Sequence, residues 1–188
     1  MFFERFDKKI IEKFALQTIS KSFNYTYGEF ILPNDTDNFD AVSLDNSRAL
    51  EVTIAVAENN MKGYVYEKEF SKGKPNLNVA DIKNAELKPS GELLFWHGGT
   101  IQELVLKIQT AVIKKDEKAR KRLATQPHSI VDLCICIADG ALLDFYSFLI
   151  MDLDLDSTVF ENYFFITSKL FIRYSKESGF EQYQLTTA

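Results

Sequence analysis

Two acidic residues on neighbouring expected strands, Asp40 and Glu51, are the clearest candidates for chemistry in this sequence. Carboxylate oxygens are hard ligands, so such a pair suits Mg²⁺ or Mn²⁺ better than Zn²⁺. A divalent metal held there would polarise a phosphodiester and lower the pKa of a bound water, which are the two requirements for phosphodiester hydrolysis near neutral pH. The pair therefore predicts a metal-dependent hydrolase site. The alternative is that Asp40 ends a loop and Glu51 is an exposed strand residue.

The two carboxylates come together only if the segment around them is a β-hairpin. The sequence predicts strands over Phe39–Leu44 and Ala49–Val56, joined by residues 45–48, which suit a tight turn. With the turn centred between residues 46 and 47, the facing pairs are Leu44 with Ala49, Val42 with Glu51, and Asp40 with Thr53. Side chains alternate along a strand, so Asp40, Glu51 and Thr53 would share one side of the hairpin. A change of one residue in the loop would send Asp40 to the other side.

A basic residue for this site is expected from the helix predicted between about residues 100 and 123. Lys115 continues the apolar stripe of that helix, so its stem should point toward the sheet. The alternative is that Lys115 extends past the edge of the core into solvent. The stripe consists of Leu104, Ile108, Ala111 and Val112.

Further cations near the end of the same helix could contact the phosphates of a nucleic acid. They are Lys114, Lys118, Lys121 and Arg122. The alternative is a solvated helix C-terminus, where cations also interact favourably with the helix dipole.

The remaining pattern predicts one mixed α/β domain, with a central mixed β-sheet flanked by helices. The first helix, over about residues 3–23, should pack through a stripe of Phe3, Phe6, Ile10, Phe14 and Gln17. The other expected elements are a strand at 25–32, a helix at 57–72, a surface loop or insertion at about 72–91, a strand at 92–97, a buried central strand at 129–138, a short helix at 142–150, and closing strands at 163–167 and 170–174 before a polar tail. Thr100 and Glu103 form a capping box that should start the long helix.

Composition sets outer limits on function. The chain has 188 residues, 46% of them hydrophobic, and a formal net charge of −5, which suits a single domain and argues against coating nucleic acid through bulk charge. The longest apolar stretches are shorter than the roughly 20 residues that a membrane-spanning helix needs, and we find no secretion signal. Cys134 and Cys136 lie in an apolar run and are expected to be core residues in a reducing, cytoplasmic setting. The 16 phenylalanines and 8 tyrosines make a homodimer through an aromatic face plausible.

The order of these elements, with Asp40 on one strand and Glu51-Val52-Thr53 on the next, resembles the PD-(D/E)xK nuclease superfamily. Asn38-Phe39-Asp40 would stand where that superfamily has Pro-Asp, and Leu50-Glu51-Val52-Thr53 where it has Glu-x-Lys. The resemblance spans most of the chain and rests on topology and a short motif. It implies a restriction-endonuclease-like fold, Mg²⁺ or Mn²⁺ bound by Asp40 and Glu51, and DNA as the substrate.

The sequence departs from the superfamily at the lysine, because Thr53 occupies that position and carries no cation. Some members take the basic residue from a neighbouring element, and Lys62, Lys68 and Lys115 are the candidates here, with Lys115 preferred. The resemblance also implies an acidic metal ligand on the first helix, for which Glu12 is the candidate, although its position opposite the phenylalanine stripe predicts an exposed side chain. We therefore expect either a divalent-metal-dependent deoxyribonuclease or an inactive nuclease fold that binds a protein or nucleic acid.

Overall fold

The computed structural model describes residues 8–22, 30–33, 38–55, 85–87, 93–95, 101–137, 153–167 and 170–184. Within these residues, a seven-stranded mixed sheet is covered by helix α1 on one face and helix α3 on the other. Helix α1 comprises Lys8–Ser22 and α3 comprises Ile101–Leu123. The expected mixed α/β architecture with a central mixed sheet is confirmed at this level.

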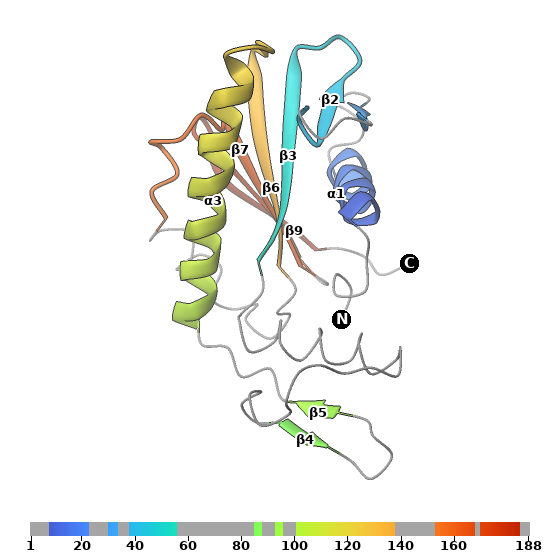
Figure 1. Cartoon of the computed structure of the whole chain (residues 1–188), viewed down its shortest axis with the longest axis vertical. Coiled ribbons are helices and arrows are strands. Elements are labelled where there is room, and N and C mark those ends of the chain that lie inside the picture. Colours follow the sequence, from blue (N-terminus) through green and yellow to red (C-terminus); the bar gives the residue numbers. More distant parts are fainter. Residues whose placement is uncertain are drawn as a thin grey trace.

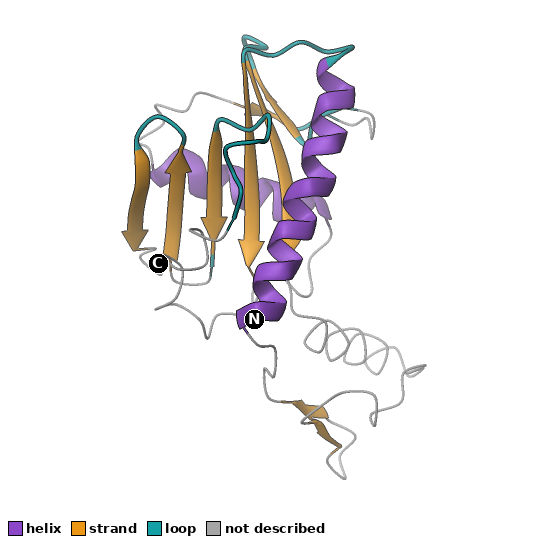
Figure 2. Ribbon diagram, turned by 90° about the vertical axis from the view of Figure 1, so that its left-hand side faces the viewer, coloured by secondary structure: helices purple, strands orange, loops and turns teal. Residues whose placement is uncertain are grey.

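The strand order in the sheet is β1-β2-β3-β6-β7-β8-β9. The strands are β1 (Phe30–Ile31), β2 (Ala41–Ser43), β3 (Arg48–Ala55), β6 (Ile130–Ile137), β7 (Asn162–Ile166), β8 (Leu170–Ser175) and β9 (Gly179–Gln184). Strand β6 pairs in parallel with β3 and β7, and the other neighbours are antiparallel. Figure 2 shows the sheet face with the strands side by side. The central, fully buried position expected for the segment 129–138 is confirmed, because every residue from Val131 to Ile137 is buried.

Alternation along the strands divides the core into two layers. Residues such as Ala49 and Leu133 pack with the apolar face of α3, whereas Leu50 and Cys134 pack with α1. Cys134 and Cys136 are free and buried, as expected for core residues, and burial raises the pKa of Cys134. Strand β3 therefore presents its odd-numbered side chains to α3, and Glu51 belongs to that set.

Strands β2 and β3 form the expected hairpin, but the expected register was wrong by two residues. Ala41 faces Leu50 and Val42 faces Ala49, so Val42 does not face Glu51. The turn closes early because the N–H of Asn46 donates to the carbonyl of Ser43 (2.9 Å) and Asn46 takes a left-handed φ of 58°. A shift of two residues preserves the face of each side chain.

The buried face of α1 differs from the expected phenylalanine stripe. Ile10 is 50% exposed and Gln17 is also exposed, while Ile11, Glu12 and Ile19 are buried. Phe3 and Phe6, on which the expected stripe depended, lie outside the described residues. The helix is therefore turned so that Glu12 faces the protein, and the expectation of an exposed Glu12 was wrong.

The C-terminal part of the sheet also contains a strand that the sequence did not suggest. The polar tail expected after residue 174 forms β9, paired with β8 through a turn at Gly179, whose φ is 76°. Within the stretch 72–91, the structure describes Ala85–Leu87 alone, which is strand β4 and pairs with β5 (Leu93–Phe95) in a separate two-stranded sheet.

Several expected elements fall outside the described residues. These are the helix at 57–72, the short helix at 142–150, most of the strand at 25–32, and Thr100 of the capping box. The helices that the structure describes include none with the length and apolar character required to cross a membrane.

Candidate functional site

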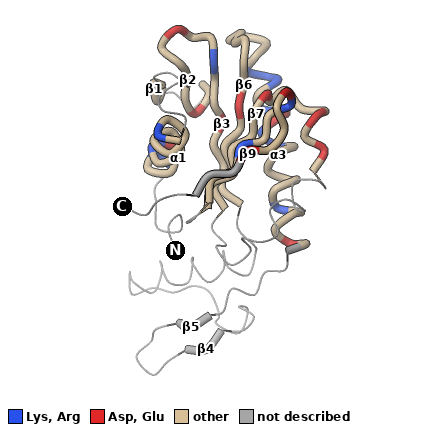
Figure 3. Tube along the Cα trace, turned by 180° about the vertical axis from the view of Figure 1, so that it is seen from behind, with Lys and Arg blue, Asp and Glu red and all other residues tan. Residues whose placement is uncertain are grey.

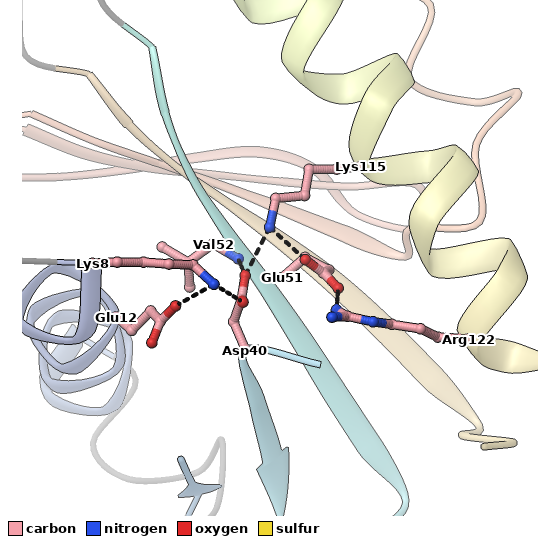
Figure 4. Close-up of polar contacts among 7 residues, drawn as sticks. All are labelled: Lys8, Glu12, Asp40, Glu51, Val52, Lys115 and Arg122. Carbon is pink, nitrogen blue, oxygen red and sulfur yellow. Dashed lines mark hydrogen bonds and ion pairs between the residues drawn. The ribbon is translucent and has the colours of Figure 1, made fainter. Parts of the chain in front are cut away.

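Glu51 lies in the middle of β3 and is completely buried on the face toward α3. Its Oε2 atom is 2.5 Å from Nζ of Lys115, and its Oε1 atom accepts a hydrogen bond from the guanidinium of Arg122. Both cations come from α3, where they are seven residues, about two helical turns, apart. The two oxygens of this carboxylate are therefore held by two different cations (Figure 4).

Asp40 lies directly before β2 and is 7% exposed. Its Oδ2 atom accepts hydrogen bonds from the backbone N–H of Val52 (2.8 Å) and from Lys115 (2.7 Å). Strand β2 begins at Ala41, which faces Leu50 of β3. Beyond this pair, the N–H of Val52 in β3 bonds to the carboxylate of Asp40 instead of to a backbone carbonyl of β2. This contact fixes Asp40 beside the strand that carries Glu51.

Lys115 joins the two acidic residues. Its side chain is 14% exposed, and its Nζ atom lies between Asp40 Oδ2 and Glu51 Oε2. The stem points toward the sheet, as its place in the apolar stripe predicted, and the alternative in which it extends into solvent does not hold. Lys62 and Lys68, the other candidates for the missing motif lysine, lie outside the described residues.

Helix α1 contributes a third carboxylate and a second lysine on the other side of Asp40. The Nζ atom of Lys8 is 2.9 Å from Asp40 Oδ1 and 3.0 Å from Glu12 Oε1. The side chain of Glu12 is 10% exposed and that of Lys8 is 67% exposed. Glu12 was a candidate from the sequence but Lys8 was not, although the spacing of four residues between them is typical of a helical ion pair.

The charges thus alternate across the site in the order Glu12, Lys8, Asp40, Lys115, Glu51 and Arg122. We call this the charged row. It contains three carboxylates and three cations, so its formal charge is balanced. Figure 3 shows charged positions on both α1 and α3, on either side of β3.

The surroundings of Asp40 and Glu51 shift the pKa values of the two carboxylates in opposite directions. Burial alone would raise the pKa of Asp40, but Lys115, the N–H of Val52 and Lys8 hold it well below its usual range. Burial raises the pKa of Glu51, and the charge of Asp40 adds to that rise although Lys115 and Arg122 oppose it. Asp40 is therefore the carboxylate that stays ionised most firmly.

A pocket of about 350 Å³ opens beside the charged row. Its polar lining comes from Lys8, Glu12, Thr53 and Lys115, and its apolar lining from Ile11, Val52 and Ile54. Thr53 shares the face of Glu51 because it follows two residues later on β3. The structure thus places Thr53 at the wall of a pocket with two cations.

The residues expected to contact nucleic acid separate into two groups. Lys114 and Lys121 are exposed on α3, and Lys118 is half-buried. Burial lowers the pKa of Lys118, and the nearby charges of Arg122 and Lys115 lower it further although Glu51 acts in the opposite direction. Arg122 is buried and bound to Glu51, so it does not lie on the surface where phosphates were expected to reach it.

The oxygens of Asp40 and Glu51 are of the hard type that a divalent cation such as Mg²⁺ prefers. Asp40 Oδ2 and Glu51 Oε2 both point to the position of one cationic nitrogen, that of Lys115. Among the described residues, no three His, Cys, Asp or Glu side chains form a metal-binding group by themselves. Mg²⁺ is often held by one or two carboxylates and completes its coordination with water and substrate phosphate, so this pair is sufficient in number.

Comparison of the chain with protein-family models, curated proteins and solved structures finds no match in any of the three. The charged row and its pocket are therefore the features from which a function is inferred.

Proposed function

We propose that this protein is a divalent-metal-dependent nuclease that hydrolyses DNA phosphodiester bonds on a restriction-endonuclease-like fold. The observation that carries the proposal is the position of Lys115 Nζ, 2.7 Å from Asp40 and 2.5 Å from Glu51. Two carboxylates from adjacent segments and a lysine form the group of residues expected for such a site, with the lysine supplied by α3 instead of by β3. This arrangement accounts for Thr53 at the motif position.

In this proposal, Asp40 and Glu51 would hold Mg²⁺ or Mn²⁺. Glu12 is an additional candidate for a metal ligand. The metal, when bound, supplies a water of lowered pKa and polarises the phosphate. Lys115, with its ammonium next to both carboxylates, would orient the attacking water and stabilise the negative charge that develops on the phosphate. Thr53 lies at the pocket wall and can donate a hydrogen bond to a substrate oxygen there.

DNA is the proposed partner because α3 presents cations near the same site. Lys114 and Lys121 are exposed on the helix that also supplies Lys115, and Lys118 lies half-buried between them in sequence. Contacts between these side chains and backbone phosphates would release counterions, so binding should weaken as salt increases. The homodimer expected from the aromatic content stays a prediction.

An inactive nuclease fold that binds a protein or nucleic acid is the second candidate. The observation that favours it is the balance of the charged row, in which three cations of the protein already neutralise three carboxylates. A buried network of this kind can have a purely structural role. Thr53 in place of the motif lysine agrees with this alternative.

Cleavage of plasmid and single-stranded DNA by the purified protein in Mn²⁺ tests the proposal. Glu51→Gln and Lys115→Met should abolish metal-dependent cleavage, because each removes one charged group at the reacting centre while nearly keeping the size of the side chain. Glu117→Gln, which changes an exposed carboxylate of the same helix, is the matched control and should cleave like the wild type. A folded wild-type protein that cleaves neither substrate in Mg²⁺ or Mn²⁺ would favour the binding module.

A further inference from the structure

Arg122 is a buried arginine in the last turn of α3, with 7% of its side chain exposed. A buried guanidinium is costly unless it is paired, and the carboxylate that pairs with it is Glu51. The carbonyl of Arg122 accepts hydrogen bonds from the N–H of Thr125 (3.0 Å) and of Gln126 (2.7 Å). The backbone that carries the guanidinium is therefore held at the end of the helix.

The guanidinium determines how Glu51 is presented to the site. It binds Oε1, while Oε2 contacts Lys115, whose Nζ atom also contacts Asp40. With Oε1 bound, the carboxylate cannot rotate without breaking a buried ion pair. Oε2 is therefore kept on the side of Asp40.

Arg122 also contacts the residue that precedes Asp40. Its guanidinium lies over the ring of Phe39, with the central carbon 5.5 Å from the ring centroid. The ring of His128 packs edge-on against Phe39 at 5.1 Å, and Nδ1 of His128 is 2.9 Å from the carbonyl of Asn46 in the hairpin turn. One buried side chain thus touches Glu51 directly and supports Asp40 through its neighbour.

We propose that Arg122 is a positioning residue that holds the Glu51 and Asp40 carboxylates in the geometry needed to bind metal, and that it does not contact DNA phosphates. This inference rests on the proposed nuclease function, and it assigns Arg122 a role different from that of the exposed lysines on the same helix. Residues that orient metal ligands typically change metal affinity or activity by about 10- to 100-fold when they are replaced.

The test compares Arg122→Gln with Arg120→Gln, which removes an arginine two positions away that is 52% exposed and bound to Asp116 on the surface. Two properties of each protein are measured: the affinity for Mn²⁺, from the electron paramagnetic resonance signal of the free ion, and the salt dependence of metal-free DNA binding. Arg122→Gln should weaken Mn²⁺ binding about 10-fold or more and lower kcat, with KM for DNA and the salt slope unchanged. Arg120→Gln should match the wild type in Mn²⁺ affinity and kcat.

The opposite result would identify a phosphate contact. In that case Arg122→Gln would keep its Mn²⁺ affinity and kcat, raise KM for DNA and reduce the magnitude of the salt slope by about 0.9. That outcome overturns the positioning role while leaving the nuclease proposal intact. A wild-type protein that neither binds Mn²⁺ nor cleaves DNA would overturn both.

Arg122→Lys provides a second test that does not depend on tolerance of a neutral side chain in the core. Lysine keeps the charge, so a phosphate contact would largely survive, but it lacks the planar guanidinium that both binds Glu51 and covers Phe39. A positioning role predicts an Mn²⁺ affinity between those of the wild type and Arg122→Gln, with unchanged DNA affinity. An Mn²⁺ affinity equal to that of the wild type would count against the role of the guanidinium.

Discussion

The carboxylate of Asp40 accepts a hydrogen bond of 2.8 Å from the backbone N–H of Val52, the residue that follows Glu51. This bond ties one acidic residue of the site to the strand of the other without any contribution from a metal. It also places Asp40 level with Glu51, since extending the observed pairing of Ala41 with Leu50 by one residue brings these two positions opposite each other. The acidic pair is thus a property of the hairpin itself.

Mn²⁺ should raise the melting temperature of the wild type and leave that of Asp40→Asn unchanged. A ligand that binds only the folded state stabilises it by about 2.7 kcal/mol at 100 times its dissociation constant, which corresponds to several degrees for a domain of this size. The measurement is differential scanning fluorimetry with and without metal. Asp154→Asn, at an exposed aspartate, is the control and should respond like the wild type. Equal shifts in all three proteins would place the metal elsewhere.

Lys8→Met should increase the affinity for Mn²⁺. Lys8 Nζ lies 2.9 Å from Asp40 and 3.0 Å from Glu12, so its positive charge opposes a metal ion bound to these carboxylates. The side chain is 67% exposed, and stability should therefore change by less than about 1 kcal/mol. Titration with Mn²⁺ measures the affinity, and Lys13→Met, an exposed lysine of the same helix, controls for net charge. An affinity that falls in Lys8→Met would mean that Lys8 supports the carboxylates in their metal-binding form.

The acid dependence of stability should separate Asp40 from Glu51. A lowered pKa in the folded state means that Asp40 stabilises the protein above its unfolded pKa of about 3.8, and that this contribution is lost as the pH falls toward the folded value. For Glu51, whose folded pKa is raised, the sign is reversed, so its contribution is complete below the unfolded pKa and is lost as the pH rises through the folded value.

Denaturant unfolding between about pH 7 and pH 2 measures this difference. Asp40→Asn should flatten the loss of unfolding free energy below about pH 4, whereas Glu51→Gln should remove a gain in unfolding free energy that the wild type shows as the pH falls toward about 4.5. Changes of the same sign in both variants would contradict the separation in acidity.

Asn46→Val should lower the free energy of unfolding by about 1–2 kcal/mol, because Asn46 has a φ of 58° that a β-branched residue adopts at a cost. Asn46→Gly should be tolerated, since glycine adopts this conformation freely. Thermal unfolding of the two variants provides the comparison. An equal loss in both would mean that the side chain of Asn46, and not its backbone angle, stabilises the turn.

The sequence predicted the acidic pair because alternation in a hairpin is robust to an error of two residues. Asp40 and Glu51 share a face at both the expected and the observed register. The register itself could not be predicted from the sequence. It depends on the left-handed conformation of Asn46 and on Asp45, which accepts hydrogen bonds from the side chains of Ser43 and Ser47. Several weak local contacts together determine the geometry of such a turn.

The orientation of α1 was predicted wrongly for a different reason. Phenylalanines dominated the apolar pattern, yet the helix buries the side that carries Ile11, Ala15 and Ile19 and exposes Ile10. Glu12 is buried with that side because its charge is met by Lys8. A pattern that assigns every carboxylate to solvent fails where the fold supplies a partner, as Lys8 does for Glu12.

Arg122 was grouped with the surface lysines because the grouping considered only the charge of these residues and not the helix face on which each lies. Its spacing from Lys115 was the available signal, since seven residues return a helix to the same face. Because Lys115 was already expected to point toward the sheet, Arg122 should have been expected to do so as well. Strand β9 was not predicted because most of its residues are polar, so it lacks a clear alternation of apolar and polar side chains. It lies at the edge of the sheet, where polar residues are common.

The charged row has a consequence for the order in which this protein folds. Asp40 and Glu51 are 11 positions apart in a local hairpin, but their shared partner Lys115 is 75 residues from the first and 64 from the second. Local hairpins form within microseconds, whereas contacts across such separations must first overcome the entropy of closing a long loop. An early hairpin therefore holds two like charges close together without the lysine that they share until α3 docks. Docking of that helix would relieve the repulsion and complete the charged row in the same step, so the row forms only when the long-range topology of the chain is in place.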